Sequence, residues 1–318
     1  MQRALLFLAG LLLVTTSAHA APAVVATTKP IHSLVASVMA GVGEPDLLVD
    51  GAASPHTYSL KPSDAAALES AGIVFWTGHG MELFLGDALG TLSGNATLVE
   101  LAETPGLDLL PMRDGGAFEA HEHEGHDHGH DHDPEGQDHA GHDHGEGDGD
   151  MHFWLDPDNA ALMVTHIADV LAETDPDNAA TYTANAVATL KSLAALEAEL
   201  ETTLAPGADR PFFVFHDAYL YFEQRFGLTA AGSITVSPEV LPGAARIDEL
   251  RYIIADRNAV CVFAEPNFEP AIVRTIIEGT PARAGTLDPE GSALEAGPYL
   301  YTELMRGLAN GMVECLAE

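Results

Sequence analysis

Four residues of metal-binding type are widely separated in the chain: His56, His152, His216 and Asp288. His216 directly follows the apolar run Phe212–Phe215, and Asp288 follows the run Ala282–Leu287. Ligands of open parallel sheets bind beyond the carboxyl ends of the strands, so we expect these side chains to converge. Three imidazoles and one carboxylate form a four-coordinate set suited to Zn²⁺, whereas Mn²⁺ prefers more oxygen ligands.

The spacing of these residues does not by itself establish a metal site. Tens of residues separate them, and they match no local zinc signature such as a helical His-Glu-x-x-His. His56 follows the expected strand Asp46–Val49, and His152 precedes a short apolar segment that we expect to be strand-like. Each histidine also fits an ordinary role as a capping or core residue, so the residues alone leave both interpretations open.

A second group of histidines lies within the segment Asp114–Asp150. This segment has 13 acidic residues, no Lys or Arg, and too few apolar residues for a core, which predicts a disordered loop. Its nine histidines are His121, His123, His126, His128, His130, His132, His139, His142 and His144. Imidazoles interleaved with carboxylates can bind zinc, copper or nickel as auxiliary ligands, and a solvated acidic linker is the alternative.

The N-terminus indicates export, and the net charge excludes one class of partner. Arg3, the apolar run Ala4–Val14 and the small residues Ala18 and Ala20 predict a signal peptide over residues 1–20 and a periplasmic mature protein. The chain has 13 basic and 48 acidic side chains, and its formal net charge is −35. This charge argues against nucleic acid or an anionic membrane as a partner.

Short apolar runs alternate with helical stretches, which predicts an α/β fold with parallel sheets covered by helices. Strands are expected in the first half at Val24–Thr27, Asp46–Val49, Ile73–Trp76 and Thr97–Val99, and in the second at Phe212–Phe215, Ala230–Thr235, Val260–Ala264 and Ala282–Leu287. The stretch Pro176–Leu204 predicts one long helix of about 40 Å. We therefore expect an N-terminal lobe over 21–175, a bridging helix over 176–204 and a C-terminal lobe over 205–318.

Cys261 and Cys315 are the two cysteines of the chain, too few for a four-thiolate zinc site. In an oxidising periplasm they can pair, and closing a loop of this size is worth roughly 4 kcal/mol in the chain-entropy model. Two free buried thiols are the alternative, and the residues alone do not decide between the two states.

Several motifs together resemble one known family. They are Pro55–Asp64, His152–Pro157, His216–Tyr219, Phe263–Pro266 and Thr286–Pro289, with the acidic histidine-rich insertion between the first two. This combination resembles the periplasmic zinc-binding component of bacterial ABC importers, in the metal-specific cluster A-I (cluster 9) of solute-binding proteins. The resemblance covers essentially the whole mature chain.

The resemblance implies two lobes, each with a small parallel sheet, bridged by a long rigid helix. It implies that His56, His152, His216 and Asp288 hold Zn²⁺ in the cleft between the lobes for delivery to a membrane permease, and that the protein is not an enzyme. A periplasmic zinc chaperone is a further partner that it allows, and we expect a monomer. Manganese-binding relatives generally carry glutamate where His216 stands. The two cysteines lie where zinc-binding members carry a disulfide.

This chain departs from the family pattern at one position, and other functions compete with transport. Some members carry a glutamate just before the first histidine, where this chain has Pro55, so the fourth ligand is Asp288 or water. His79, after the strand Ile73–Trp76, is either an auxiliary ligand or, as we expect, an exposed loop residue.

A storage protein that binds metal through the loop histidines is the main alternative to a transport component. A zinc hydrolase is less favoured, because the sequence offers no convincing general base.

Overall fold

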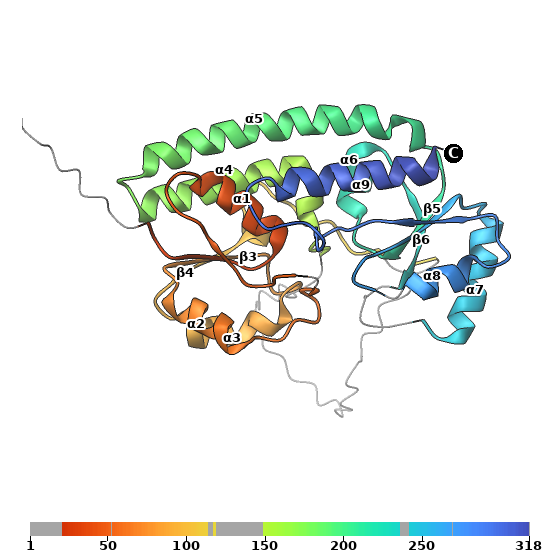
Figure 1. Ribbon diagram of the computed structural model, residues 1–318, viewed down its shortest axis with the longest axis horizontal. Coiled ribbons are helices and arrows are strands. Elements are labelled where there is room, and N and C mark those ends of the chain that lie inside the picture. The colour runs from red at the N-terminus through yellow and green to blue at the C-terminus, as the bar shows by residue number, and fades with distance from the viewer. Residues whose placement is uncertain are drawn as a thin grey trace, which may run out of the picture.

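The computed structural model describes residues 21–51, 53–113, 117–118, 149–235, 242–268 and 270–317. Within these residues the chain forms two four-stranded parallel sheets, one from each half of the sequence (Figure 1). The expected α/β fold with two small parallel sheets flanked by helices is thus confirmed. The expected signal peptide and the nine loop histidines lie outside the described residues. No described helix is both long and apolar enough to cross a membrane.

The N-terminal sheet has the strand order β2-β1-β3-β4. Its elements, in chain order, are β1 (Val24–Ala26), α1 (Lys29–Met39), β2 (Asp46–Leu47), α2 (Pro62–Ser70), β3 (Ile73–Trp76), α3 (Gly86–Leu92) and β4 (Thr97–Glu100). Successive strand residues point to opposite faces, so Ile73 and Phe75 pack in the core that includes α1. Val74 and Trp76 pack on the other face, in a core with residues of α2 and α3.

The C-terminal sheet repeats this plan with the order β6-β5-β7-β8. Its elements are β5 (Phe212–His216), α6 (Leu220–Phe226), β6 (Ala230–Thr235), α7 (Ala244–Asp256), β7 (Cys261–Ala264), α8 (Pro270–Ile277), β8 (Arg283–Thr286) and α9 (Leu300–Leu316). Phe213 and Phe215 pack with residues of α7 and α8 on the outer face. Phe212 and Val214 belong instead to the core that contains α1 and α9.

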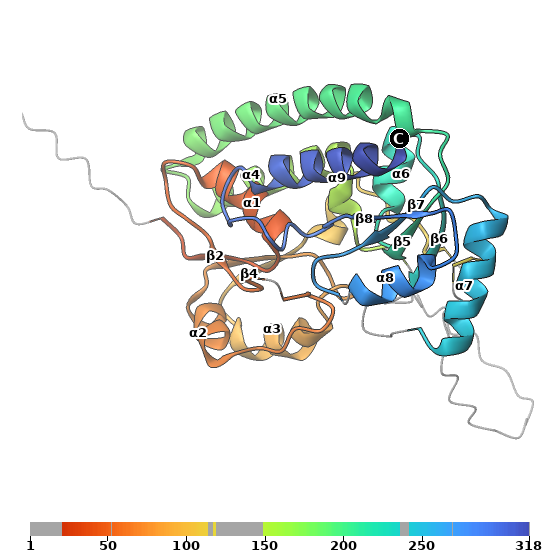
Figure 2. The same cartoon turned by 45° about the vertical axis from the view of Figure 1, so that its right-hand side comes forward.

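Two further helices connect the two halves of the chain. They are α4 (Pro157–Thr174) and α5 (Ala179–Leu204), which follow the N-terminal sheet and precede the C-terminal sheet in the sequence. The 26-residue helix α5 extends along the molecule past both sheets (Figures 1 and 2). It begins three residues later than the expected Pro176, because Asp175 and Asn178 form a hydrogen-bonded turn there. One continuous core includes residues of α1, α4, α5, α9 and both sheets. A rigid rotation of one lobe against the other would therefore disrupt this shared core.

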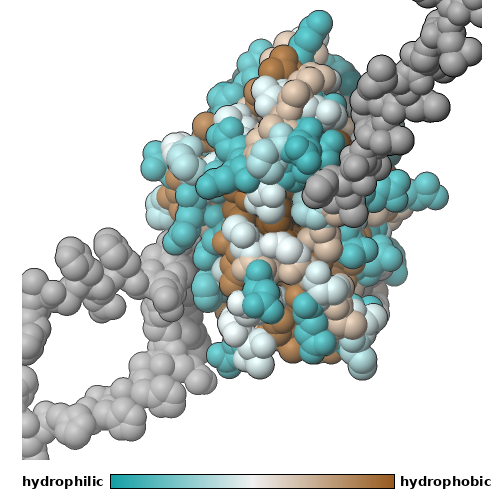
Figure 3. Space-filling model, turned by 90° about the vertical axis from the view of Figure 1, so that its left-hand side faces the viewer, coloured by the Kyte–Doolittle hydropathy of each residue, from teal (hydrophilic) through white to brown (hydrophobic). Residues whose placement is uncertain are grey.

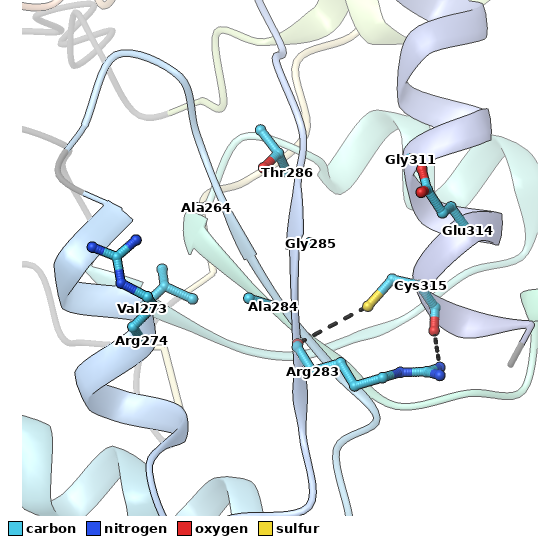
Figure 4. Close-up of a pocket in the computed structure, with 10 residues that line it drawn as sticks. All are labelled: Ala264, Val273, Arg274, Arg283, Ala284, Gly285, Thr286, Gly311, Glu314 and Cys315. Atoms are coloured by element: carbon cyan, nitrogen blue, oxygen red, sulfur yellow. Dashed lines mark hydrogen bonds between the residues drawn. The ribbon is translucent and has the colours of Figure 1, made fainter.

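Cys261 and Cys315 form a disulfide that links β7 to α9, so the pairing left open above is present. Next to it lies a cavity of about 550 Å³ (Figure 4). Residues of β8, α8 and α9 line this cavity, and the Arg283 guanidinium donates to the carbonyl oxygen of Cys315 across one side of it. The described lining includes none of the four expected metal ligands, so this cavity is not the predicted site.

The exposed large apolar side chains of the described chain come from separate elements. The most exposed are Leu83, Val187, Tyr252 and Tyr299. On the face shown in Figure 3, brown hydrophobic residues likewise form small groups among hydrophilic and intermediate ones. Isolated surface apolar residues of this kind are common in soluble proteins and call for no special explanation.

Candidate metal centre

Three imidazoles from distant parts of the chain meet where the two lobes join. His56 lies in the loop between β2 and α2, His152 directly precedes a 3₁₀ turn, and His216 is the last residue of β5. One nitrogen of each ring lies within 4.8 Å of a nitrogen of both others, an arrangement that could hold a metal ion. The ring centroid of His56 lies 5.4 Å from that of His152 and 5.6 Å from that of His216, and the centroids of His152 and His216 are 5.2 Å apart.

The two inner imidazoles have the spacing of zinc ligands. Nε2 of His152 and Nε2 of His216 are 3.3 Å apart. Two nitrogens at about 2.0–2.1 Å from one tetrahedral zinc ion are themselves about 3.3 Å apart. The pair therefore presents its Nε2 atoms at a separation that suits a shared Zn²⁺.

The loop that carries His56 is tied to its sequence neighbours. The backbone N–H of His56 donates to Oγ of Ser54 over 3.3 Å. The Tyr58 hydroxyl contacts the backbone carbonyl of Leu48 at 3.2 Å and donates to the Asp64 carboxylate at 2.8 Å. These contacts hold the loop against the end of β2 and the start of α2, and leave His56 half-buried.

The segment after His152 is a 3₁₀ turn, Phe153–Leu155, so the expectation of a strand-like segment was wrong. All three turn residues are buried, whereas a half-buried strand would alternate. Two signals mark the start of helix α4 directly after the turn, which leaves no room for a strand. Asp156 caps α4 by accepting from the N–H of Asp158, and Pro157 occupies the first helical turn. A short apolar run cannot be assigned by periodicity alone.

Each inner imidazole is held by a buried carboxylate that was not among the ligands expected from the sequence. Oδ1 of Asp150 accepts from the backbone N–H of His152 at 2.9 Å and lies 2.7 Å from its Nδ1. Oε1 of Glu265 lies 3.5 Å from the backbone N of His216 and 2.7 Å from its Nδ1. A signal was available for Glu265, because it directly follows the expected strand Val260–Ala264, and ligands bind beyond the carboxyl ends of such strands.

Burial and these carboxylates shift the pKa values of the imidazoles in different directions. Burial, followed by the neighbouring imidazoles, holds the pKa of His56 well below its ordinary value. Burial and nearby His216 act in the same way on the pKa of His152. Burial also opposes charge on His216, but the negative charge and hydrogen bond of Glu265 prevail, and its pKa is raised. Burial raises the pKa of the Asp150 carboxyl to about 7.

Asp288 and His79 lie outside the group of three imidazoles. The Asp288 carboxylate follows β8 and accepts from the Ser292 hydroxyl at 2.9 Å and from two backbone N–H groups at 3.3 Å. His79 lies on a loop with about half of its side chain exposed, next to the Trp76 ring and 3.4 Å from the Glu100 carboxylate. The structure thus brings together three of the four expected ligands.

The C-terminal boundary of the expected loop Asp114–Asp150 was wrong, because Asp150 belongs to the folded part. Its side chain is 4% exposed, and its backbone N–H donates to the carbonyl of Leu110 over 2.7 Å. Pro111 and Gly149 form an antiparallel bridge beside it. The Tyr221 hydroxyl donates to the Asp150 carbonyl over 2.8 Å. Composition marks this region as polar, but tertiary contacts order its end.

Comparisons with known proteins point to one family. The family described as "Zinc-uptake complex component A periplasmic" (ZnuA) matches residues 24–315 of this chain. The high-affinity zinc uptake system protein ZnuA of Brucella suis biovar 1 is 52% identical over 306 residues, which cover 93% of this chain and 92% of that protein. The ZnuA protein of Yersinia pestis is 39% identical over 297 residues, with 93% and 92% covered.

Solved structures show the same fold. A crystal structure of ZnuA superposes with a TM-score of 0.75 at 25% identity, covering 93% of this chain and 99% of that chain. The structure of a ZnuA deletion mutant with zinc bound has a TM-score of 0.73 at 25% identity, with 94% and 99% covered. The matched range of the sequence includes His56, His152, His216 and Asp288.

Proposed function

This chain belongs to the ZnuA family of periplasmic zinc-uptake components, and from this premise we propose that it captures Zn²⁺ between its lobes and delivers it to the membrane permease of an ABC importer. The ion is cargo in this role, bound and released unchanged, so the site needs no general base. The observation that carries the proposal is the convergence of His56, His152 and His216, whose donor nitrogens lie within 4.8 Å of one another.

The donor set fits zinc by its chemistry. Neutral imidazole is a good ligand for Zn²⁺, and three nitrogens with one further ligand make a tetrahedral site. The lowered pKa values of His56 and His152 keep these two rings neutral at pH 7 and ready to bind. Carboxylate-rich sites would suit Mn²⁺ better, and no carboxylate belongs to the described group of three.

The fourth ligand in this proposal is water or Asp288. Asp288 follows β8 at the carboxyl edge of the C-terminal sheet, as His216 does on β5. Its carboxylate is engaged by Ser292 and by backbone N–H groups, so it would have to exchange these bonds for the metal. The Asp288→Asn variant separates the alternatives, because its zinc affinity falls if the carboxylate is a ligand and stays unchanged if water is.

The same proposal places the protein in its cellular context. Residues 1–20 act as the signal peptide that directs export, and the mature protein works as a monomer in the periplasm. In this proposal a periplasmic zinc chaperone donates the ion to the protein. The histidine-rich segment gathers zinc near the cleft, through residues that lie outside the described part of the chain.

Zinc titration of the metal-free mature protein, in competition with a chelator of known affinity, tests the proposal. We expect one tight ion per chain and loss of that ion in the His216→Ala variant. The same variant should fail to restore growth in zinc-depleted medium to a bacterium that lacks its own zinc-binding component, whereas the natural chain should succeed. Equally tight binding by His216→Ala, or several equivalent weak ions only, would overturn the proposal.

A further inference from the structure

We propose that Asp150 and Glu265 are positioning residues of the metal centre, each holding one imidazole so that its Nε2 faces the ion. This inference deepens the proposed function and rests on it. The carboxylates do not touch the metal in this arrangement. They act through His152 and His216, whose ring orientation and protonation they determine.

The two contacts share one geometry although they arise from different parts of the fold. In each case a single carboxylate oxygen approaches both the backbone N and the ring Nδ1 of the same histidine. The distances are 2.9 and 2.7 Å from Asp150 to His152, and 3.5 and 2.7 Å from Glu265 to His216. Contact at two points restricts rotation of the ring about its side-chain bonds, so the orientation of the imidazole is defined before metal arrives.

The carboxylates are themselves held in place. The backbone of Asp150 is bonded to Leu110 on one side and to the Tyr221 hydroxyl on the other. Glu265 also accepts from the Tyr219 hydroxyl, over 3.3 Å. The side chains of Asp150 and Glu265 are each 4% exposed, so water does not compete freely for their oxygens. Both are therefore fixed acceptors rather than mobile surface carboxylates.

A carboxylate on Nδ1 has a specific chemical consequence. A neutral imidazole carries one ring proton, and an acceptor at Nδ1 keeps the proton there, which leaves the Nε2 lone pair for the metal. The Nε2 atoms of His152 and His216 are the pair found 3.3 Å apart. A negative partner also makes the imidazole a more basic ligand.

The charges of the inner site also match a divalent ion. Three neutral imidazoles leave the full charge of Zn²⁺ uncompensated, and a buried uncompensated charge is costly. The carboxyl groups of Asp150 and Glu265 lie directly behind the ligands, where negative charge offsets that of the ion. Because both oxygens lie within hydrogen-bond distance of the ligand rings, this compensation acts at short range in a buried site.

The test uses the full mature chain with Asp150→Asn and Glu265→Gln, which remove the charge and keep the size of the side chain. Glu82→Gln is the matched control. Glu82 is a fully buried carboxylate that accepts backbone N–H bonds from Thr77 and Gly78, and it bonds to no histidine in the described structure. Zinc affinity is measured by chelator competition, and the imidazole protons are followed by long-range ¹H–¹⁵N spectra of the zinc-bound proteins.

We expect zinc affinity to fall by about 10–100-fold in each of the two variants and to stay near the natural value in Glu82→Gln. In the zinc-bound natural chain the spectra should show His152 and His216 protonated at Nδ1 and metallated at Nε2. In each variant the Nδ1 proton of the affected ring alone should exchange faster, because a neutral amide oxygen is a weaker acceptor than a carboxylate. A merely structural role would not produce this ring-specific change.

Unchanged affinity in both variants, or an equal loss in Glu82→Gln, would overturn the inference. So would spectra that show Nδ1 of either ring bound to the metal. The His216→Ala variant separates this failure from failure of the proposed function. If that variant binds zinc as tightly as the natural chain, the site itself is misassigned. If it loses zinc while the two carboxylate variants keep it, only the positioning role fails.

Discussion

The metal centre has two unlike halves. The inner half is His152 and His216, which are 6% and 2% exposed and lie against Asp150 and Glu265. The outer half is His56, which is half-buried in a loop without regular secondary structure. The inner pair is built on the end of a sheet strand and the start of a helical turn, whereas the loop of His56 is tied mainly to its own sequence neighbours.

The difference suggests separate roles: the inner pair of imidazoles holds the zinc ion, and the loop of His56 lets it enter and leave. A pair of rings that is already oriented loses little conformational entropy on binding, so it can supply most of the affinity. The outer loop can adjust locally without disturbing the core that the two lobes share. We therefore expect entry and release of the ion to involve movement around His56 rather than rotation of the lobes.

The largest expected effect is on zinc affinity when ligands are removed from the two halves separately. A zinc site contributes roughly 10–16 kcal/mol, or roughly 3 kcal/mol per ligand, so His216→Ala should weaken binding by at least about a hundredfold. His56→Ala should cost about tenfold, since water can replace an outer ligand. Chelator competition on the metal-free proteins measures both values. Equal losses in the two variants would contradict the division into halves.

The next effect concerns the stability of the scaffold behind the inner half. Arg113 pairs with Asp217, the neighbour of His216, and with the buried Glu223. Arg113→Leu leaves two largely buried carboxylates without their partner, and we expect the free energy of unfolding to fall by about 3 kcal/mol. Chemical denaturation of the metal-free protein measures this change.

Arg306→Leu is the matched control for Arg113→Leu. Arg306 pairs with Glu199 where both side chains are about half exposed. Water and salt screen such a surface pair, so the free energy of unfolding should stay within experimental error of the natural value. Comparable losses in the two variants would mean that burial does not set the importance of these pairs.

A change in pH acts on the two sides of the inner half through different groups. Zinc needs the neutral form of His216, whose pKa is raised above 6.5 by Glu265, and the ionised form of Asp150, whose pKa burial raises to about 7. Below these values two protons compete with the metal, so affinity should fall by up to about a hundredfold per pH unit. Chelator competition between about pH 5 and 8 follows this loss.

The Glu265→Gln variant sharpens the pH prediction. Without Glu265, burial still lowers the pKa of His216, and only the weaker effects of the Asp217 and Asp150 charges oppose it, so this ring stays neutral to lower pH. The slope of log affinity against pH should then fall from about two protons to about one, the one at Asp150. A slope identical to that of the natural chain would show that Glu265 does not control the proton on His216.

The smallest expected effect on the tight site comes from deletion of residues 119–148. This deletion removes all nine histidines of the segment but keeps Gly149 and Asp150, which contact the folded part. Titration calorimetry should show fewer zinc ions bound per chain and one tight ion with unchanged affinity. A deletion extended through Asp150 should weaken the tight ion as well, because His152 loses its acceptor. Loss of the tight ion in the shorter deletion would contradict an independent inner site.

Much of the fold was predictable because hydrophobic patterning is local. The buried runs at Ile73–Trp76 and Ala230–Thr235 were expected at the bounds that the structure shows. The helix α2 over Pro62–Ser70 has a similarly local origin, since Pro62 suits a first helical turn. The three-residue turn after His152 was missed, because so short a run carries no period that separates strand from turn.

The amino-acid sequence by itself determined the α/β alternation, the candidate ligands His56, His152 and His216, and the resemblance to zinc-binding transport components. Only the tertiary structure decided that Glu265 would lie behind His216, and that Asp150 would be ordered rather than part of the acidic segment. The physical reason is that strand order sets such contacts: β7 lies beside β5, which brings together two residues 49 positions apart. Residue type and local period do not encode which strands become neighbours.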